Sequence, residues 1–276
     1  MRAWRVAAPF VAGAGCESNA AVSRAVAEPG AEAEAAIAAA SRGARGWRWV
    51  SAALLLMAAF ALKQGYSHAG SEQLSWVLGP SCWLAQHLGG VPLLREVGAG
   101  FISHSPRMVV GPACAGVNFL VVCWLALYFS QQARCITRRE LFGLAAVSGT
   151  AAYLATLATN GMRIALAAQL YAAELPGWLT PERAHRLLGV VLYCAVLLGL
   201  CRLADHVGAS LQLKAAGLRV PPLAIYLAVV LGAPLLRRAY RVHPQQFVEH
   251  ALFTVPAAVL VALAFAAFER LRHRDR

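Results

Sequence analysis

Long apolar stretches separated by short arginine clusters constrain the fold of this chain more than any other feature of its sequence. Of its 276 residues, 59% are hydrophobic and only 14% are charged, whereas about a quarter of the residues in a soluble domain are charged. The mean hydropathy is +0.56. A helix needs ~20 predominantly apolar residues to cross a bilayer, and several stretches approach that length. The sequence therefore predicts an all-α fold, a polytopic bundle of transmembrane helices.

We expect about six membrane-spanning helices and one interfacial or re-entrant segment. The predicted spans cover residues 49–62, 109–130, 141–160, 185–203, 220–236 and 250–268, and the third continues as an amphipathic helix to residue 171. Residues 74–94 mix tryptophans with polar residues and glycines, which is typical of a helix at the membrane surface. If this segment crossed the membrane fully, the count would be seven.

The predicted bundle covers residues 47–269 and is flanked by two tails. Residues 1–46 are rich in Ala, Glu and Gly, and we expect a mobile cytoplasmic tail with a weak helix over residues 31–40. This tail has no apolar core near Met1 of the length that a signal peptide requires. Residues 270–276 form a second, strongly basic tail that we also place in the cytoplasm.

Arginine clusters orient the predicted bundle, because positively charged loops lie on the cytoplasmic side of membrane proteins. With six spans, the clusters at residues 42–48, 134–139, 202–219 and 270–276 all fall on that side. Residues 237–241 are the one violation, since their arginines fall outside. These loops account for the net charge of +12. No basic stripe with interleaved aromatic residues indicates a nucleic-acid partner.

The same orientation brings three chemically active side chains to the outer ends of their helices. Cys114 lies near the start of the second span, Arg163 lies just beyond the third, and His185 begins the fourth. A helix N-terminus stabilises a thiolate, and histidine can serve a thiol as base and then as acid. An arginine can hold a developing oxyanion. The three residues together predict a catalytic site for acyl transfer.

Two asparagines are placed to support these groups. Asn118 follows Cys114 by about one helical turn and Asn160 precedes Arg163 by about one turn, so each pair shares a helix face. Each of the three active side chains also has a structural alternative. Cys114 can pack like an alanine in a tight helix contact, Arg163 can snorkel to the membrane surface, and His185 can be an ordinary interfacial histidine.

The seven cysteines form no C-x-x-C pair, and most lie inside apolar runs, where we expect small buried hydrophobes. Only Cys82 and Cys114 fall near the outer surface, and a disulfide between them would silence the thiol. The histidines lack the spacing of metal ligands, so we expect neither a metal nor another cofactor. The G-x-S-x-G and G-x-G-x-x-G motifs of other enzyme classes do not occur.

Three segments, in this order, resemble the signature segments of the exosortase/archaeosortase family. They are Pro112-Ala113-Cys114-Ala115-Gly116-Val117-Asn118-Phe119, Asn160-Gly161-Met162-Arg163-Ile164 and His185-Arg186-Leu187-Leu188-Gly189. The first is most similar to the exosortase K variant. The resemblance covers residues 47–204 and implies a cysteine transpeptidase of the bacterial inner membrane. It further implies that Cys114 is the nucleophile, Arg163 the transition-state stabiliser and His185 the acid and base.

The resemblance also implies the partners. They would be exported proteins with a C-terminal sorting tail of the PEP-CTERM type, in which a short motif precedes a transmembrane helix and a basic cluster. The site would face the periplasm or exterior and be surrounded by membrane lipid. Residues 1–46 and the last two spans carry no matching motif. The main alternative is a small transporter or a non-catalytic membrane assembly protein, although no internal repeat of the kind found in many transporters is visible.

Overall fold

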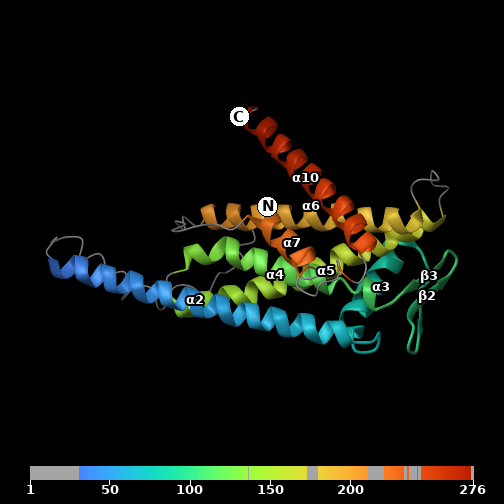
Figure 1. Cartoon of the computed structure of the whole chain (residues 1–276), viewed down its shortest axis with the longest axis horizontal. Coiled ribbons are helices and arrows are strands. Elements are labelled where there is room, and N and C mark those ends of the chain that lie inside the picture. Colours follow the sequence, from blue (N-terminus) through green and yellow to red (C-terminus); the bar gives the residue numbers. More distant parts are fainter. Residues whose placement is uncertain are drawn as a thin grey trace, which may run out of the picture. The chain divides into compact units, whose positions relative to one another are not determined.

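The computed structural model describes residues 31–135, 137–172, 180–210, 221–232, 235, 241 and 244–274. It divides the chain into two compact units, Met1–Val50 and Ser51–Arg276, and the predicted site lies entirely in the second. Figure 1 colours the elements along the chain. In order, they are α2 (Ala31–His68), α3 (Ser75–Gly89), β1 (Leu94–Glu96), β2 (Gly100–His104), β3 (Arg107–Val110), η1 (Pro112–Cys114), α4 (Val117–Gln131), η2 (Gln132–Arg134), α5 (Arg138–Ala172), α6 (Pro181–Ser210), α7 (Pro222–Val230) and α10 (Pro244–Arg274).

Five helical stretches are long and apolar enough to cross a membrane, by length and composition. They are Gly46–His68, Pro112–Arg134, Arg138–Tyr171, Arg183–Ser210 and Phe247–Leu271. The prediction of an all-α polytopic bundle is confirmed, and the chain is a membrane protein. The sixth predicted span, residues 220–236, contains α7, which has only 9 residues; part of that span lies outside the described residues. Helix α3 has 15 residues, too few for a full crossing, which fits an interfacial segment.

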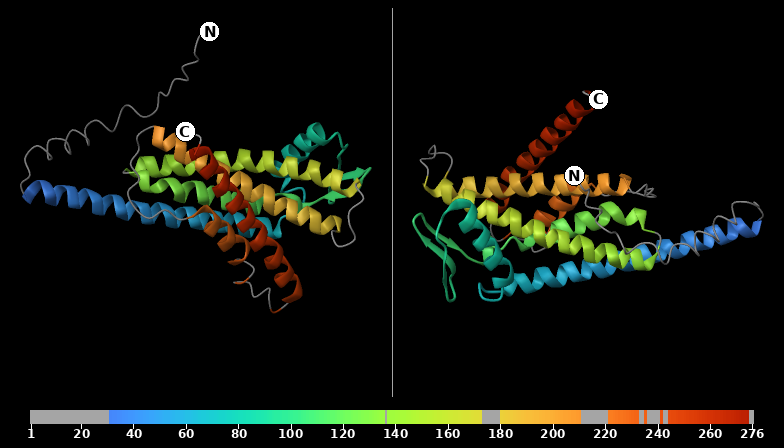
Figure 2. Two further views of the ribbon diagram at one scale, coloured as in Figure 1. Left: turned by 90° about the horizontal axis from the view of Figure 1, so that it is seen from above. Right: turned by 180° about the vertical axis from the view of Figure 1, so that it is seen from behind.

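Helix α4 is the central helix of the second unit. Of its candidate span, 67% is buried within the protein, against 28% or less for the other four. It contacts α5, α6 and α7, and α4, α5 and α6 lie side by side in Figures 1 and 2. Helix α10, by contrast, leaves large apolar side chains such as Leu252 and Leu263 exposed, as expected of a surface that faces lipid.

Small residues bring α3 close to the part of α5 that carries Arg163. A Cβ on Gly161 of α5 would lie 2.9 Å from Cδ2 of Leu84, and a Cβ on Gly89 of α3 would lie 3.1 Å from Cβ of Ala165. Gly161 and Ala165 are one turn apart on α5, so both contacts lie along one face. This close approach, common between membrane helices, fixes α3 beside the predicted site.

A three-stranded antiparallel sheet follows α3 and was not predicted from the sequence. Its strand order is β1-β2-β3, and β2 pairs with β3 so that Phe101 is opposite Val110 and His104 is opposite Arg107. The predicted second span began at Val109, which is wrong: residues 107–110 are strand β3 and α4 begins only at Val117. Hydropathy alone does not distinguish a short apolar strand from a helix.

The ends of several other elements also differ from the prediction. Residues 31–46, assigned to a tail, form the first part of α2, and the weak helix predicted over residues 31–40 is included in it. Residues 1–30 of that tail lie outside the described residues. So do most of the predicted polar loop after α5 (residues 173–179), residues 237–240 of the arginine cluster on the outer side, and the last two residues of the basic tail.

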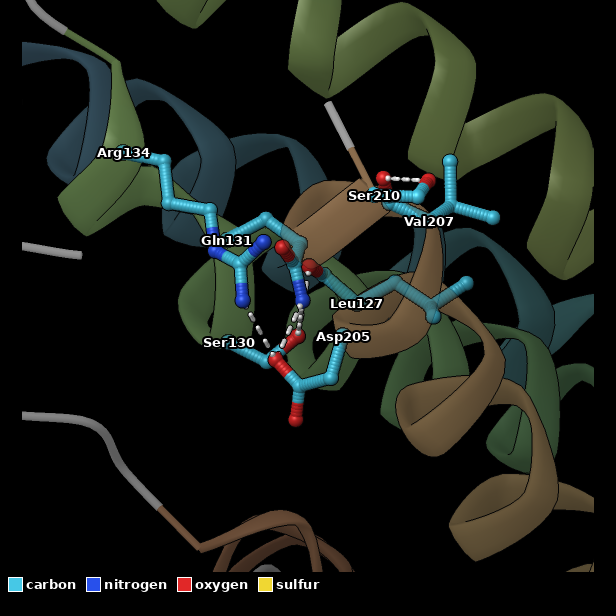
Figure 3. Close-up of polar contacts among 7 residues, drawn as sticks. All are labelled: Leu127, Ser130, Gln131, Arg134, Asp205, Val207 and Ser210. Carbon is cyan, nitrogen blue, oxygen red and sulfur yellow. Dashed lines mark hydrogen bonds and ion pairs between the residues drawn. The ribbon is translucent and has the colours of Figure 1, made fainter. Parts of the chain in front are cut away.

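A polar cluster joins the C-terminal end of α4 to α6, at the end of the bundle away from the sheet. Nη2 of Arg134 and Nε2 of Gln131 each donate a hydrogen bond to Oδ1 of Asp205, both at 3.1 Å, as Figure 3 shows. The Arg134 side chain is only 6% exposed, and a Cβ on Gly208 would overlap its guanidinium. The cluster therefore fixes α6 against α4 far from the sheet.

Candidate active site

Cys114 lies in the short connection between β3 and α4. Residues Pro112–Cys114 form the turn η1, and Gly116 then adopts a left-handed conformation, with φ of 73°, before α4 begins. Glycine suits this position because other residues are strained there, and because a Cβ would lie 3.2 Å from Cγ of Asn160. The expectation that Cys114 opens the helix is therefore wrong. The thiol belongs to a separate turn and does not sit at the helix N-terminus.

Two side chains of α5 hold the main chain of Cys114. Nδ2 of Asn160 donates to the Cys114 carbonyl oxygen at 2.7 Å, and Nη2 of Arg163 donates to the same oxygen at 3.4 Å. Arg163 is 9% exposed, so it does not snorkel to the membrane surface. Its Nε is buried and finds no hydrogen-bond partner in the described part of the chain. The two residues thus share a face of α5 as predicted and fix the position of the Cys114 turn.

Tyr193 of α6 supports both α5 side chains, and the sequence analysis missed it. Its hydroxyl donates to Oδ1 of Asn160 at 3.2 Å. The Arg163 guanidinium lies over its ring, 5.4 Å from the centroid, which is a cation–π contact. Phe119 of α4 stacks on the same ring with a centroid separation of 4.4 Å. One aromatic side chain therefore positions both groups that contact Cys114.

His185 lies on the same face of α6 as Tyr193. Gly189 and Tyr193 follow His185 at intervals of one helical turn, and a Cβ on Gly189 would lie 3.4 Å from Nη1 of Arg163. His185 is half-buried, and its Nδ1 is buried without a partner among the described residues. It is therefore not an ordinary surface histidine. The spacing of His185, Gly189 and Tyr193 is the sequence signal that could have revealed Tyr193.

Cys114 and His185 line one cavity of about 480 Å³. The β2–β3 hairpin forms one wall through residues 102–104 and 107–109, and Ala167 and Tyr171 of α5 line it as well. Cys114 is half-buried, so its thiol is not enclosed as an alanine in a tight helix contact would be. The structure therefore brings together the thiol, the imidazole and, beside the Cys114 carbonyl, the guanidinium.

Asn118, predicted to support Cys114, points elsewhere. Its side chain is exposed, and its Oδ1 accepts a hydrogen bond from Nζ of Lys63. The helix begins only after Gly116, so the expected one-turn relation between Cys114 and Asn118 does not exist. Sequence spacing was misleading here because it assumed that the helix continues through Gly116.

The disulfide considered from the sequence is not formed, since Cys82 and Cys114 are both free. Burial, with a smaller contribution from the nearby Cys114, raises the pKa of the Cys82 thiol to about 12. Cys82 is also fully buried, whereas Cys114 is half-buried, so Cys82 is the less accessible of the two thiols. In the part of the chain that the structure describes, no group of three His, Cys, Asp or Glu side chains could hold a metal ion.

The site thus offers a thiol and an imidazole on one cavity, with a guanidinium beside them. A Cys–His pair with a nearby fixed cation is suited to acyl transfer through a covalent intermediate. Comparison with known proteins gives no match to any family model, curated protein or solved structure.

Proposed function

We propose that this protein is a membrane-embedded cysteine transpeptidase or protease that removes C-terminal sorting tails from exported proteins. One observation carries the proposal: Cys114 and His185 line the same cavity, and Arg163 donates to the main chain of Cys114. The resemblance of the three segments around these residues to the exosortase family supports it. On that basis the tails are of the PEP-CTERM type, with a short motif, a transmembrane helix and a basic cluster.

The reaction proceeds through a thioester. His185 takes the proton of the Cys114 thiol, and the sulfur attacks the carbonyl carbon of the substrate peptide bond. Arg163 stabilises the resulting oxyanion. As the carbon–nitrogen bond breaks, His185 returns the proton to the leaving amine, and the acyl group remains on Cys114. An acceptor amine or water then attacks the thioester and regenerates the thiol.

The cavity faces the periplasm or exterior of a bacterial inner membrane in this proposal. Arg138 begins α5, and Arg163 lies about seven turns, or about 38 Å, further along the same helix. That distance exceeds the ~30 Å thickness of the hydrocarbon core. Arg134, Arg138 and Arg139 mark the cytoplasmic side, so Arg163 belongs at the opposite surface. The transmembrane helix of the substrate would dock against the bundle from the lipid.

Coexpression in membranes with a tailed candidate substrate tests the proposal, with tail removal scored on a gel. We expect Cys114→Ala to abolish tail removal and to eliminate a hydroxylamine-sensitive acyl-enzyme. Cys123→Ala is the matched control, because Cys123 is a fully buried thiol of α4 away from the cavity. Tail removal that continues in Cys114→Ala would leave Cys114 a packing residue. It would favour a transporter or an assembly protein instead.

A further inference from the structure

The cavity beside Cys114 has one guanidinium in its lining and a second close by, and none of its described lining residues is acidic. His104 and Arg107 of the hairpin and His185 of α6 line it, and Arg163 lies beside the Cys114 carbonyl. A cleft lined by one sign of charge, with walls of low dielectric constant, raises the local concentration of ligands of the opposite charge. The cavity is therefore electrostatically suited to an anionic group.

Arg107 is available to bind such a group. Arg95, an arginine on β1 of the same sheet, bonds Glu72. The side chain of Arg107, in contrast, has no ion-pair or hydrogen-bond partner among the described residues. It lies directly opposite His104 in the β2–β3 register, so its cross-strand neighbour offers it no carboxylate. A guanidinium can bind a carboxylate through two parallel hydrogen bonds.

Ser103 supplies a further polar group in the same wall. Its side chain is 1% exposed, it lines the cavity, and its Oγ has no hydrogen-bond partner within the described part of the chain. A buried hydroxyl without a partner is destabilising. An oxygen of a ligand at this wall would satisfy it.

We infer that the cavity binds a carboxylate of the substrate peptide, with Arg107 as its main partner and Ser103 and His104 as further donors. This inference rests on the proposed function and specifies how the substrate is recognised. Strand β3 leads directly into the turn that ends at Cys114. A carboxylate held at Arg107 therefore belongs to a residue close to the peptide bond that Cys114 attacks.

The shape of the cavity favours an extended peptide as the source of the carboxylate. Its volume of about 480 Å³ lies in the range of small-ligand sites and admits a short chain segment. Two strands, β2 and β3, form one wall, and strands commonly bind extended peptides through backbone hydrogen bonds and alternate side-chain pockets. A lipid phosphate is also anionic, but it has no peptide backbone that could form hydrogen bonds with these strands.

Two thiol reagents of opposite charge test the inference without requiring catalysis. The full chain in phosphatidylcholine nanodiscs is treated with an anionic sulfonatoethyl or a cationic trimethylammonioethyl methanethiosulfonate, and modification of Cys114 is followed by mass spectrometry. Each rate is divided by the rate with 2-mercaptoethanol. We expect the anionic reagent to be favoured by about tenfold or more. Arg107→Gln should remove most of this preference, and Arg107→Lys should retain it.

Arg95→Gln is the matched control, because it removes a paired arginine of the same sheet that does not line the cavity. It should leave the preference intact. Equal normalised rates in the unmodified chain, or equal losses in Arg95→Gln and Arg107→Gln, would overturn the inference.

Protection experiments identify the source of the carboxylate. N-acetyl-Ala-Glu-Ala-amide should slow the modification of Cys114 by the anionic reagent, and the corresponding glutamine peptide should not. Protection by phosphatidylglycerol in the nanodisc, without protection by the glutamate peptide, would mean that the cavity binds a lipid phosphate and not a peptide carboxylate. That result would overturn the inference.

The outcomes also separate this inference from the proposed function. If tail removal does not depend on Cys114 while the charge preference holds, the proposed function fails and the anion site stands. If tail removal requires Cys114 but the charge preference does not appear, only the inference of a carboxylate site is wrong, and the proposed function stands.

Discussion

Two buried arginines lie at opposite ends of the second unit, and different kinds of group contact them. Arg134 donates to the carboxylate of Asp205, which also accepts from Gln131. Arg163 contacts a main-chain carbonyl and the ring of Tyr193, and no carboxylate among the described residues pairs with it. A buried charge is expensive unless it is paired, and this holds especially within a membrane protein.

The difference supports the proposed function, in which Arg134 is structural and Arg163 acts on the substrate. Arg134 offsets its burial with an acidic partner on α6, so its effect is to hold two helices together. Both arginines keep buried nitrogens without a partner among the described residues, Nε and Nη1 in Arg134 and Nε in Arg163, so the difference is the carboxylate that pairs with Arg134 alone. Arg163 instead lies beside Cys114, which lines a cavity. Its uncompensated charge is available to a group that becomes negative during reaction, which is the requirement for stabilising an oxyanion.

Replacing Arg163 should have the largest effect on activity. We expect Arg163→Gln to lower the rate constant of tail removal by about 10²- to 10³-fold, because removing one donor to an oxyanion costs about that much. The melting temperature in detergent should change little, because the loss of the contacts with Cys114 and Tyr193 is offset by the removal of a buried charge without an acidic partner. A variant that unfolds readily but keeps its activity per folded molecule would instead make Arg163 structural, like Arg134.

Replacing Arg134 should give the reverse pattern. We expect Arg134→Met to lower the free energy of unfolding by about 2 kcal/mol, because Asp205 loses its charged partner; the 32% exposure of the Asp205 side chain keeps the loss below that of a fully buried pair. The rate of tail removal per folded molecule should stay close to that of the unmodified chain. Unfolding followed by intrinsic fluorescence in detergent gives the stability.

A double substitution sharpens this test. Arg134→Met combined with Asp205→Asn should recover part of the lost stability, because the carboxylate that has lost its guanidinium partner is then replaced by a neutral amide. If the two substitutions were simply additive, the ion pair would not be what holds α4 and α6 together at this end of the bundle.

A smaller effect is expected at Tyr193. Tyr193→Phe removes the hydroxyl that donates to Asn160 but keeps the ring that contacts Arg163 and Phe119. We expect a loss of about 1 kcal/mol for the hydrogen bond and a tail-removal rate lowered by about fivefold, since that energy corresponds to such a factor. The Michaelis constant should change less than the rate constant.

Tyr128→Phe is the matched control for Tyr193→Phe. Tyr128 of α4 donates its hydroxyl to Oγ of Ser51 at 2.7 Å, away from Cys114. This substitution should lower stability to a similar extent without slowing tail removal. Equal slowing in both variants would mean that Tyr193 acts only through general stability.

The sequence drew attention to Arg163 and His185 because ionisable side chains are costly in apolar sequence, and to Cys114 because it lies near the start of an apolar run. A cysteine, an arginine and a histidine at the ends of apolar runs are conspicuous in a membrane protein, and the arginine clusters placed these ends on one side. The length and apolar character of the helices were predictable from the long apolar runs between the arginine clusters. The contacts that hold the site together were not predicted. Tyr193 follows His185 and Gly189 at helical spacing, but a tyrosine in an apolar span equally fits ordinary packing.

The sheet could not be predicted because its strands have only 3 to 5 residues. Strand β1 is exposed throughout and β3 is apolar at its end, so neither shows the alternation that identifies a strand. The span predicted to begin at Val109 assigned the end of β3 to a helix, so the turn at Gly116 was not predicted. That error also produced the incorrect placement of Asn118, since helical spacing was counted through a residue where the helix has not begun.

The smallest expected effect concerns the two thiols near the sheet and tests whether accessibility is confined to the cavity that Arg163 adjoins. Because burial raises the pKa of Cys82 to about 12, its thiol stays protonated at pH 8, and only about 1% is thiolate at pH 10. The thiolate is the reactive form. N-ethylmaleimide should therefore modify Cys114 in the folded protein and leave Cys82 untouched up to pH 10, as peptide mass spectrometry would show. Cys82→Ala should leave the labelling of Cys114 unchanged.

Modification of Cys82 at a rate comparable to that of Cys114 would mean that α3 separates from α5. Reagent access would then not be confined to the cavity near Arg163 but would include the whole contact between α3 and α5.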